Sequence, residues 1–163
     1  MTVQARVTLW VLGLAFVALA AVLQGVAPPE GWFAFEFPAW SGVDPGAWSQ
    51  FEREGVFFGL GLDYLFIFVY AAFVTVLGGA VGARIPAEDV CRSCLPKLSL
   101  WIWAAALADA LENWGLHCWL GEGEGWLVTI SIVATVKWLF VALMVILQLV
   151  GLWKLLAWRN KRG

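Results

Sequence analysis

The sequence predicts an all-α integral membrane protein, built as an up-down bundle of four transmembrane helices with a short interfacial helix in the first outer loop. The 163 residues are 62% hydrophobic and only 13% charged, whereas soluble domains are about half apolar and about a quarter charged. The apolar residues gather in four stretches, each long enough for the ~20 residues that cross ~30 Å of hydrocarbon. No stretch alternates apolar and polar residues as the strands of a membrane barrel do.

The four stretches form a single transmembrane domain over residues 1–163, because no linker or low-complexity tract divides them. We expect spans at about residues 7–26, 56–81, 98–120 and 126–153. A cleavable signal peptide is the alternative for the first span, since Arg6 precedes its apolar run. That run is longer than the apolar part of most leaders, and residues 24–29 make a poor cleavage site. We therefore interpret it as a helix.

The loops alternate in charge, and this alternation predicts the orientation of the chain. The first loop (residues 27–55) is acidic through Glu30, Glu36, Asp44, Glu52 and Glu54, and the third loop (residues 121–125) through Glu122 and Glu124. The basic residues outside the spans are Arg6, Arg53, Arg84, Arg92, Lys97, Lys154, Arg159, Lys161 and Arg162. All but Arg53 lie in the termini or the second loop, so both termini are expected in the cytoplasm. We expect the basic tail to lie against anionic membrane lipid, and no binding to nucleic acid.

The first outer loop divides into two halves. Its aromatic first half, residues 31–38, is expected at the level of the lipid headgroups. In the second half Asp44 suits a helix cap and Pro45 the first helical position. We predict a short interfacial helix from Pro45 to Glu54 that leads into the second span. A surface lid without further role is the alternative.

Glycines gather near both ends of the second span. They are Gly55, Gly59 and Gly61 at its outer end and Gly78, Gly79 and Gly82 at its inner end. Small residues let membrane helices approach closely. We therefore expect other helices to pack tightly against this span.

Ionisable side chains inside the predicted spans mark the candidate site. Asp63, Asp109, Glu112 and Lys137 interrupt apolar segments, where an ionised group costs roughly 2.5–3.5 kcal/mol on insertion scales. Counting ~1.5 Å per residue places all four at a similar depth, roughly 10–16 Å below the outer boundary. Residues of three separate spans therefore reach one slab of the outer half of the bundle.

The helical repeat adds three polar neighbours to this group. Tyr70 shares a face with Asp63, seven residues earlier. Asn113 belongs to the stripe of Asp109, and His117 lies roughly 80° from that stripe. We expect Asp63, Tyr70, Asn113 and His117 to contact a ligand.

The charges of this group do not balance. Lys137 is the natural partner of Asp109, but three carboxylates face one ammonium. A dry site does not hold two unpaired anions, so a carboxyl is protonated or a cation completes the site. Three interpretations stay open: an ion-pair network that sets helix register, a binding or catalytic site, and an ion or proton path. The path is disfavoured, because the ionisable residues stop near mid-membrane.

The cysteines predict no metal or redox site. Cys91 and Cys94 form a C-x-x-C motif in the predicted cytoplasmic loop, where thiols stay reduced. Zinc would need two more ligands nearby. Four-helix membrane enzymes that form disulfides need a second cysteine pair, and only Cys118 remains. We expect inert thiols, and the sequence defines no cofactor.

Three segments resemble those of a group of small, uncharacterised bacterial four-span membrane proteins. These proteins carry G-L-D-x-L-F-x-x-x-Y, which matches Gly61–Tyr70, and D-x-x-E-N, which matches Asp109–Asn113. They also have a lysine in the last span, where this chain has Lys137. The resemblance implies a bacterial inner-membrane protein and brings no activity with it.

Together these observations favour a polar cavity that opens toward the outer leaflet. It would bind a small amphipathic or cationic molecule, such as a lipid or isoprenoid, with Asp109, Glu112 and Lys137 as acid–base groups. Two other classes of function stay open. One is a proton-coupled or ion transporter, and the other is a non-catalytic subunit of a complex or a homo-oligomer.

Overall fold

The computed structural model describes residues 3–122 and 124–160 of the chain. Some of the charged residues that predict the orientation are not described. Lys161 and Arg162 lie outside the described residues, as do the side chains of Glu122, Glu124 and Arg159. Secondary structure within the described part is helical throughout, which confirms the all-α class.

Four helices in the described part are long and apolar enough to cross a membrane, as the sequence predicts. They are α1 (Val3–Gly25), α4 (Gln50–Gly82), the segment Cys91–Gly121 and α7 (Leu127–Asn160). The third segment comprises α5 (Cys91–Leu98), the 3₁₀ turn η2 (Ser99–Trp101) and most of α6 (Ile102–Glu122). Each is longer than its predicted span, because the helices continue beyond the apolar core of each segment.

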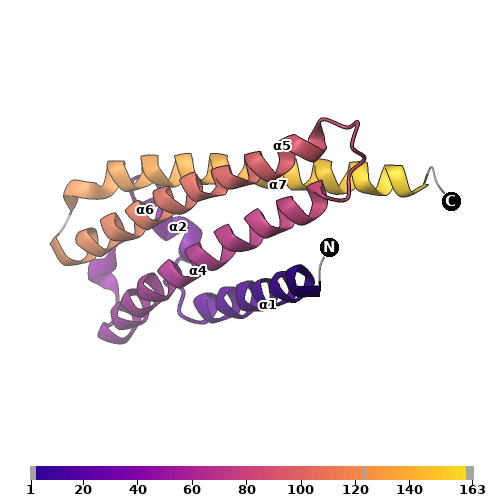
Figure 1. The fold of residues 1–163 in the computed structure, drawn as a ribbon. Coiled ribbons are helices and arrows are strands. Elements are labelled where there is room, and N and C mark those ends of the chain that lie inside the picture. Colours follow the sequence, from indigo (N-terminus) through magenta and orange to yellow (C-terminus); the bar gives the residue numbers. More distant parts are fainter. Residues whose placement is uncertain (1–2, 123, 161–163) are drawn as a thin grey trace.

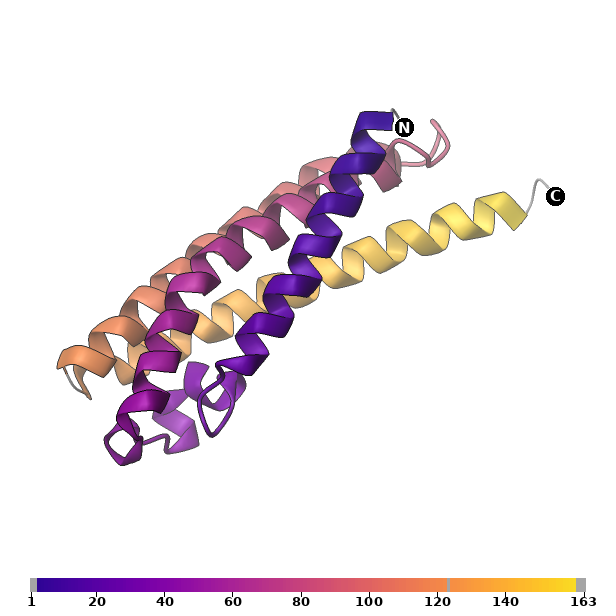
Figure 2. The same cartoon turned by 90° about the horizontal axis from the view of Figure 1, so that it is seen from below.

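The long helices lie side by side, and their ends gather at two poles (Figures 1 and 2). α6 packs against α7 and α4, whereas α1 packs on the outside of α4. One pole holds the start of α1, α5 and the end of α7. The other pole holds the α6–α7 connection, where η3 (Glu124–Trp126) lies, and the short helices of the first loop.

Aromatic stacking holds α1 on α4. The Phe16 ring lies 5.1 Å from the ring of Phe66 and 6.0 Å from that of Phe73. Leu23 is the one buried residue of α1, so most of this helix presents apolar side chains outward. Such a surface suits contact with lipid tails.

The predicted interfacial helix from Pro45 to Glu54 is wrong as a single element. Asp44 does accept a hydrogen bond from the Gly46 N–H, but the turn η1 ends at Ala47 (Pro45–Ala47). Trp48 and Ser49 are extended, and α4 begins at Gln50. The reason is a capping box: Ser49 accepts from the Glu52 N–H while Glu52 accepts from the Ser49 N–H, which starts a new helix there.

The aromatic half of the first loop folds onto the bundle, and its expected position at the level of the headgroups stays a prediction. It forms α2 (Trp32–Glu36) and α3 (Pro38–Ser41). Phe35 is fully buried, with its ring 5.6 Å from the rings of both Trp48 and Trp119. Burial of one aromatic side chain stabilises by roughly 1.5–3 kcal/mol, so Phe35 anchors α2 inside the protein.

Close helix contacts occur at some of the predicted glycines and not at others. A Cβ on Gly78 would overlap the Ser99 side chain, and a Cβ on Gly59 would lie 2.8 Å from the Trp32 ring. A Cβ on Gly55, Gly61 or Gly79 would meet no atom within 4 Å. The expectation of tight packing therefore holds for one face of α4.

Replacing Gly78 by alanine is expected to lower the free energy of unfolding by about 1–3 kcal/mol, because the new methyl group overpacks the contact with Ser99. Gly79→Ala, one residue along the same helix, should cause no such loss. Thermal unfolding in lipid nanodiscs measures the stability of both variants relative to the wild type. Equal effects of the two variants would contradict the assigned packing face.

Lys154 forms an ion pair between α7 and the second loop, and the expected contact of the basic tail with lipid stays a prediction. Its Nζ lies 2.9 Å from both carboxylate oxygens of Asp89, which also accepts the Cys91 N–H at 2.8 Å. These bonds, that from Lys154 first, lower the pKa of Asp89 below its ordinary value. The contribution of Asp89 to stability is therefore present above its unfolded pKa and is lost as the pH falls through its folded pKa.

Lys154→Met is expected to raise the pKa of Asp89 back toward its ordinary value, since the strongest stabiliser of the carboxylate is then gone. A carbon-13 NMR titration of labelled aspartate measures the change. Lys97→Met, which removes the same charge from an exposed position of α5, is the control. An unchanged Asp89 titration in Lys154→Met would show that the ion pair does not form.

Candidate functional site

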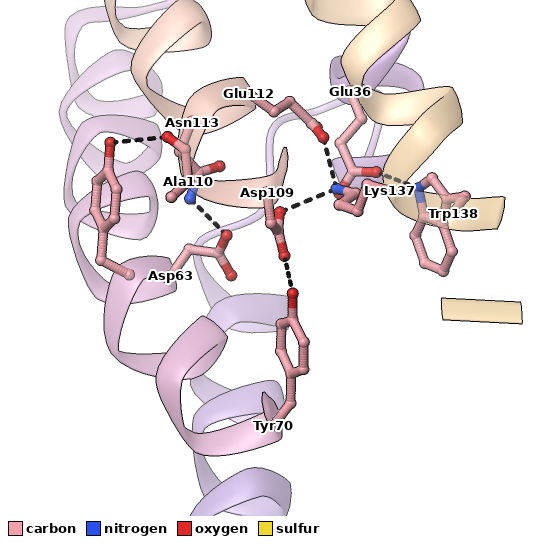
Figure 3. A network of polar contacts seen from close by, with 10 residues as sticks. Glu36, Asp63, Tyr70, Asp109, Ala110, Glu112, Asn113, Lys137 and Trp138 are labelled. Carbon is pink, nitrogen blue, oxygen red and sulfur yellow. Dashed lines mark hydrogen bonds and ion pairs between the residues drawn. The ribbon is translucent and has the colours of Figure 1, made fainter. Parts of the chain in front are cut away.

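Lys137 lies at the centre of the candidate site. Its Nζ lies 3.0 Å from Glu36 Oε1, 3.1 Å from Asp109 Oδ1 and 2.9 Å from Glu112 Oε2. Figure 3 shows these carboxyl groups converging on the ammonium of α7 from α2 and α6. The Lys137 side chain is 5% exposed and that of Glu112 is 0% exposed, so water screens these contacts little. The expected Asp109–Lys137 pair is confirmed.

Two hydrogen bonds tie α4 to this group. The Tyr70 hydroxyl donates to Asp109 Oδ2 at 3.0 Å, and Asn113 Nδ2 donates to Asp63 Oδ2 at 2.7 Å (Figure 3). Asp109 therefore receives hydrogen bonds from both Tyr70 and Lys137. Asp63 is joined to α6 through Asn113 and, in the described part of the chain, forms no ion pair with Lys137. The shared helix faces predicted from spacing are confirmed for these residues.

Glu36 is a member of the site that sequence reasoning misses, because its position in the first loop assigns it to the charges of the outer side. Phe35 anchors α2, and the side chain of Glu36 then reaches Lys137. Trp138 Nε1 donates to its other oxygen at 2.7 Å. The signal in the sequence was a carboxylate between Phe35 and Phe37, in a segment too apolar to remain in water.

A second contact fixes the loop onto α7. The Ala39 N–H donates at 3.3 Å to Oγ of Ser131, which precedes Lys137 by six residues on α7. Ser131 is fully buried, and this bond gives its hydroxyl oxygen a hydrogen-bond donor from the loop. α2 and α3 are therefore held against α7 at two points, Glu36 in α2 and Ala39 in α3.

His117 does not join the cluster in the structure. Its ring is exposed and packs edge-on against Phe57 at 5.0 Å. It lies one turn beyond Asn113 on α6, toward the pole of the α6–α7 connection. A ligand-binding role for His117 stays a prediction without support from these contacts.

A cavity of about 530 Å³ begins at the cluster and continues between α1, α4 and α7. Its polar lining at the cluster comprises Glu36, Asp63, Tyr70, Asp109, Lys137 and Trp138. The remaining lining is apolar apart from Gln148. Ligand pockets are typically ~300–1,000 Å³, mostly apolar and supplied with a few convergent polar groups. The cavity has this character.

Glu112 stands apart from the other acids, because it does not line the cavity. It is 1% exposed, and its Oε1 has no hydrogen-bond partner among the described residues. Its Oε2 lies close to the Lys137 ammonium without good hydrogen-bond geometry. Glu112 therefore contacts Lys137 on the side away from the cavity, whereas Asp109 and Lys137 themselves border the cavity.

The charge imbalance is larger than the sequence predicts. Three carboxyl groups contact one ammonium, and a fourth, that of Asp63, joins the same cluster through Asn113. Isolated buried charges cost several kcal/mol each, so the excess negative charge must be neutralised by protons or by a bound cation. Within the described residues, no group of three or more histidine, cysteine, aspartate or glutamate side chains is arranged to hold a metal ion.

The comparisons with known proteins give no family: no protein-family model, no curated protein and no solved structure matches this chain.

Lys137→Met is expected to lower the free energy of unfolding by about 3–5 kcal/mol, because three carboxyl groups then lose their shared counter-charge. Adding Glu112→Gln should restore part of that loss, since it removes one of the uncompensated acids. Lys154→Met, at an ion pair whose side chains are 33% and 28% exposed, is the control and should have a much smaller effect. Additive losses in the double variant would show that Glu112 and Lys137 do not interact. Chemical unfolding in detergent micelles measures five proteins: the wild type, Lys137→Met, Glu112→Gln, their double variant and Lys154→Met.

Proposed function

We propose that the chain is a multi-pass protein of the bacterial inner membrane, with its four long helices crossing up and down and both termini in the cytoplasm. The basic residues outside the spans support this orientation. The start of α1, α5 and the end of α7 share one pole, which suits a common cytoplasmic side. The cluster around Lys137 then belongs to the outer half of the bundle.

We further propose that the cavity binds a small cationic amphiphile. The observation that carries this proposal is the excess of carboxyl groups at the end of an apolar cavity. Glu36, Asp63 and Asp109 border the cavity, and among the described lining residues Lys137 is the one cation that opposes them. A positively charged head group would supply the missing charge, and an apolar tail would fill the rest of the space.

The residues around the head group would have different tasks. Asp63 has one oxygen engaged by Asn113, which leaves the other for a ligand. Asp109 is held by Tyr70 and Lys137, so its position is fixed before a ligand binds. Proton transfer to or from the head group would fall to Asp109 or Lys137, because acid–base catalysis needs groups within ~3 Å of the substrate. Glu112 would act only through Lys137.

Dodecylamine is expected to bind to the protein in zwitterionic nanodiscs more tightly than dodecanol or dodecanoate, because only the amine carries a positive charge. Asp63→Asn and Asp109→Asn should each weaken its binding about tenfold or more, since a hydrogen bond to a charged group contributes ~1.5–3 kcal/mol. Isothermal titration calorimetry, corrected with empty nanodiscs, measures these affinities.

Asp44→Asn is the matched control for these variants. It removes an acidic charge from the same predicted outer side, yet asparagine caps a helix as well as aspartate does. Its affinity for dodecylamine should equal that of the wild type. Equal binding of the amine and the alcohol, or no effect of Asp63→Asn and Asp109→Asn, would contradict the proposal. The contacts of Lys137 would then serve as a purely structural ion-pair network.

A further inference from the structure

The cavity is elongated, because its lining follows stripes along two helices that run in the same direction. On α7 the stripe extends from Lys137 through Val141 and Gln148 to Leu152. On α4 it extends from Asp63 to Leu77. Fifteen residues of helix span roughly 22 Å, so the space is much longer than the polar cluster at its one end.

A second polar group lies far along this cavity. Gln148, on the same face of α7 as Lys137, lines the cavity and is 7% exposed. Its Nε2 donates to Ser99 Oγ at 2.9 Å and to the Val74 carbonyl at 3.3 Å. Ser99 in turn donates to the Leu95 carbonyl at 2.8 Å, which fixes its hydroxyl as the acceptor for Gln148. The amide of Gln148 is thus locked in orientation.

The Oε1 of Gln148 is left without a partner. It is buried and has no hydrogen-bond donor among the described residues. A buried acceptor without a donor costs free energy, and a structural clamp would need only the Nε2 side of the amide. The close packing of Gly78 against Ser99 and Gln148 keeps the amide beside the cavity.

We infer that the cavity holds a long-chain amine that carries a hydrogen-bond donor, such as a hydroxyl, at the other end of its chain. This inference rests on the proposed binding of a cationic head group by Asp63 and Asp109. The far donor would bind to Gln148 Oε1, and the chain would lie against apolar side chains such as Phe66, Phe73 and Met144. The ligand is therefore polar at both ends and apolar between them.

The spacing of the two ends sets the length of the chain. Lys137 and Gln148 are eleven residues apart, or roughly 16 Å along α7. Carbon–carbon bonds of ~1.5 Å at tetrahedral angles advance about 1.25 Å per bond in an extended chain. The span therefore corresponds to about a dozen methylene groups.

The test compares dodecylamine with 12-aminododecan-1-ol on the wild type and on Gln148→Met, by calorimetry in zwitterionic nanodiscs. We expect the ratio of their affinities to shift about fivefold toward dodecylamine in Gln148→Met, as expected for loss of one neutral hydrogen bond. Thr135→Val, on the same helix, is the matched control. It removes one neutral hydrogen bond, from the Thr135 hydroxyl to the Ser131 carbonyl, at a position that does not line the cavity, so it should keep the wild-type ratio.

A ligand series on the wild type gives a second test that needs no variant. Amino alcohols of eight, ten, twelve, fourteen and sixteen carbons should bind most tightly near the chain length that spans the two ends. A steady rise of affinity with chain length, or the same affinity ratio in wild type and Gln148→Met, would overturn the inference. If dodecylamine still depends on Asp109, the proposed function survives that result. If neither amine binds to the wild type, both fail.

Discussion

The contact of the Lys137 ammonium with carboxyl groups of two other segments is the interaction on which the site depends. Glu36 arrives from the first loop, and Asp109 and Glu112 arrive from α6. Each would be costly alone in an apolar bundle, and each is tolerable because the others are there. The cluster therefore joins α2, α6 and α7, while Tyr70 and Asn113 extend it to α4.

This cluster closes one end of an apolar cavity, and the two features together give the site its chemical character. An ion-pair network that served stability alone would need no adjoining space and no surplus of acids. The surplus groups, Asp63 above all, face a space lined almost entirely by hydrocarbon. Gln148, locked by Ser99 and Val74, adds a second polar point to the same space. The cavity has excess acidic groups at one end and apolar side chains along the rest, so it favours a ligand with a cationic head and an apolar chain.

Much of this arrangement could be predicted from the sequence, because a charged residue inside an apolar run is easy to recognise and its burial is known to be costly. Asp109, Glu112 and Lys137 stand out in apolar runs, and helical periodicity assigns Tyr70 and Asn113 to their faces. Glu36 could not be placed in the same way, since its position depends on the tertiary burial of Phe35 between Trp48 and Trp119. Sequence reasoning misses the break at Trp48 and Ser49, because it uses the single N-cap of Asp44 and overlooks the capping box of Ser49 and Glu52 that starts α4. The unpartnered oxygen of Gln148 is also a property of packing and not of sequence pattern.

Native mass spectrometry of the protein, released from its own membrane in mild detergent, tests the central claim most directly. The wild type should carry a bound small molecule that is released as a cation, and Asp109→Asn should have lost it while remaining folded. An adduct-free wild type, or an adduct that is equally abundant in Asp109→Asn, would contradict a cation site beside Lys137.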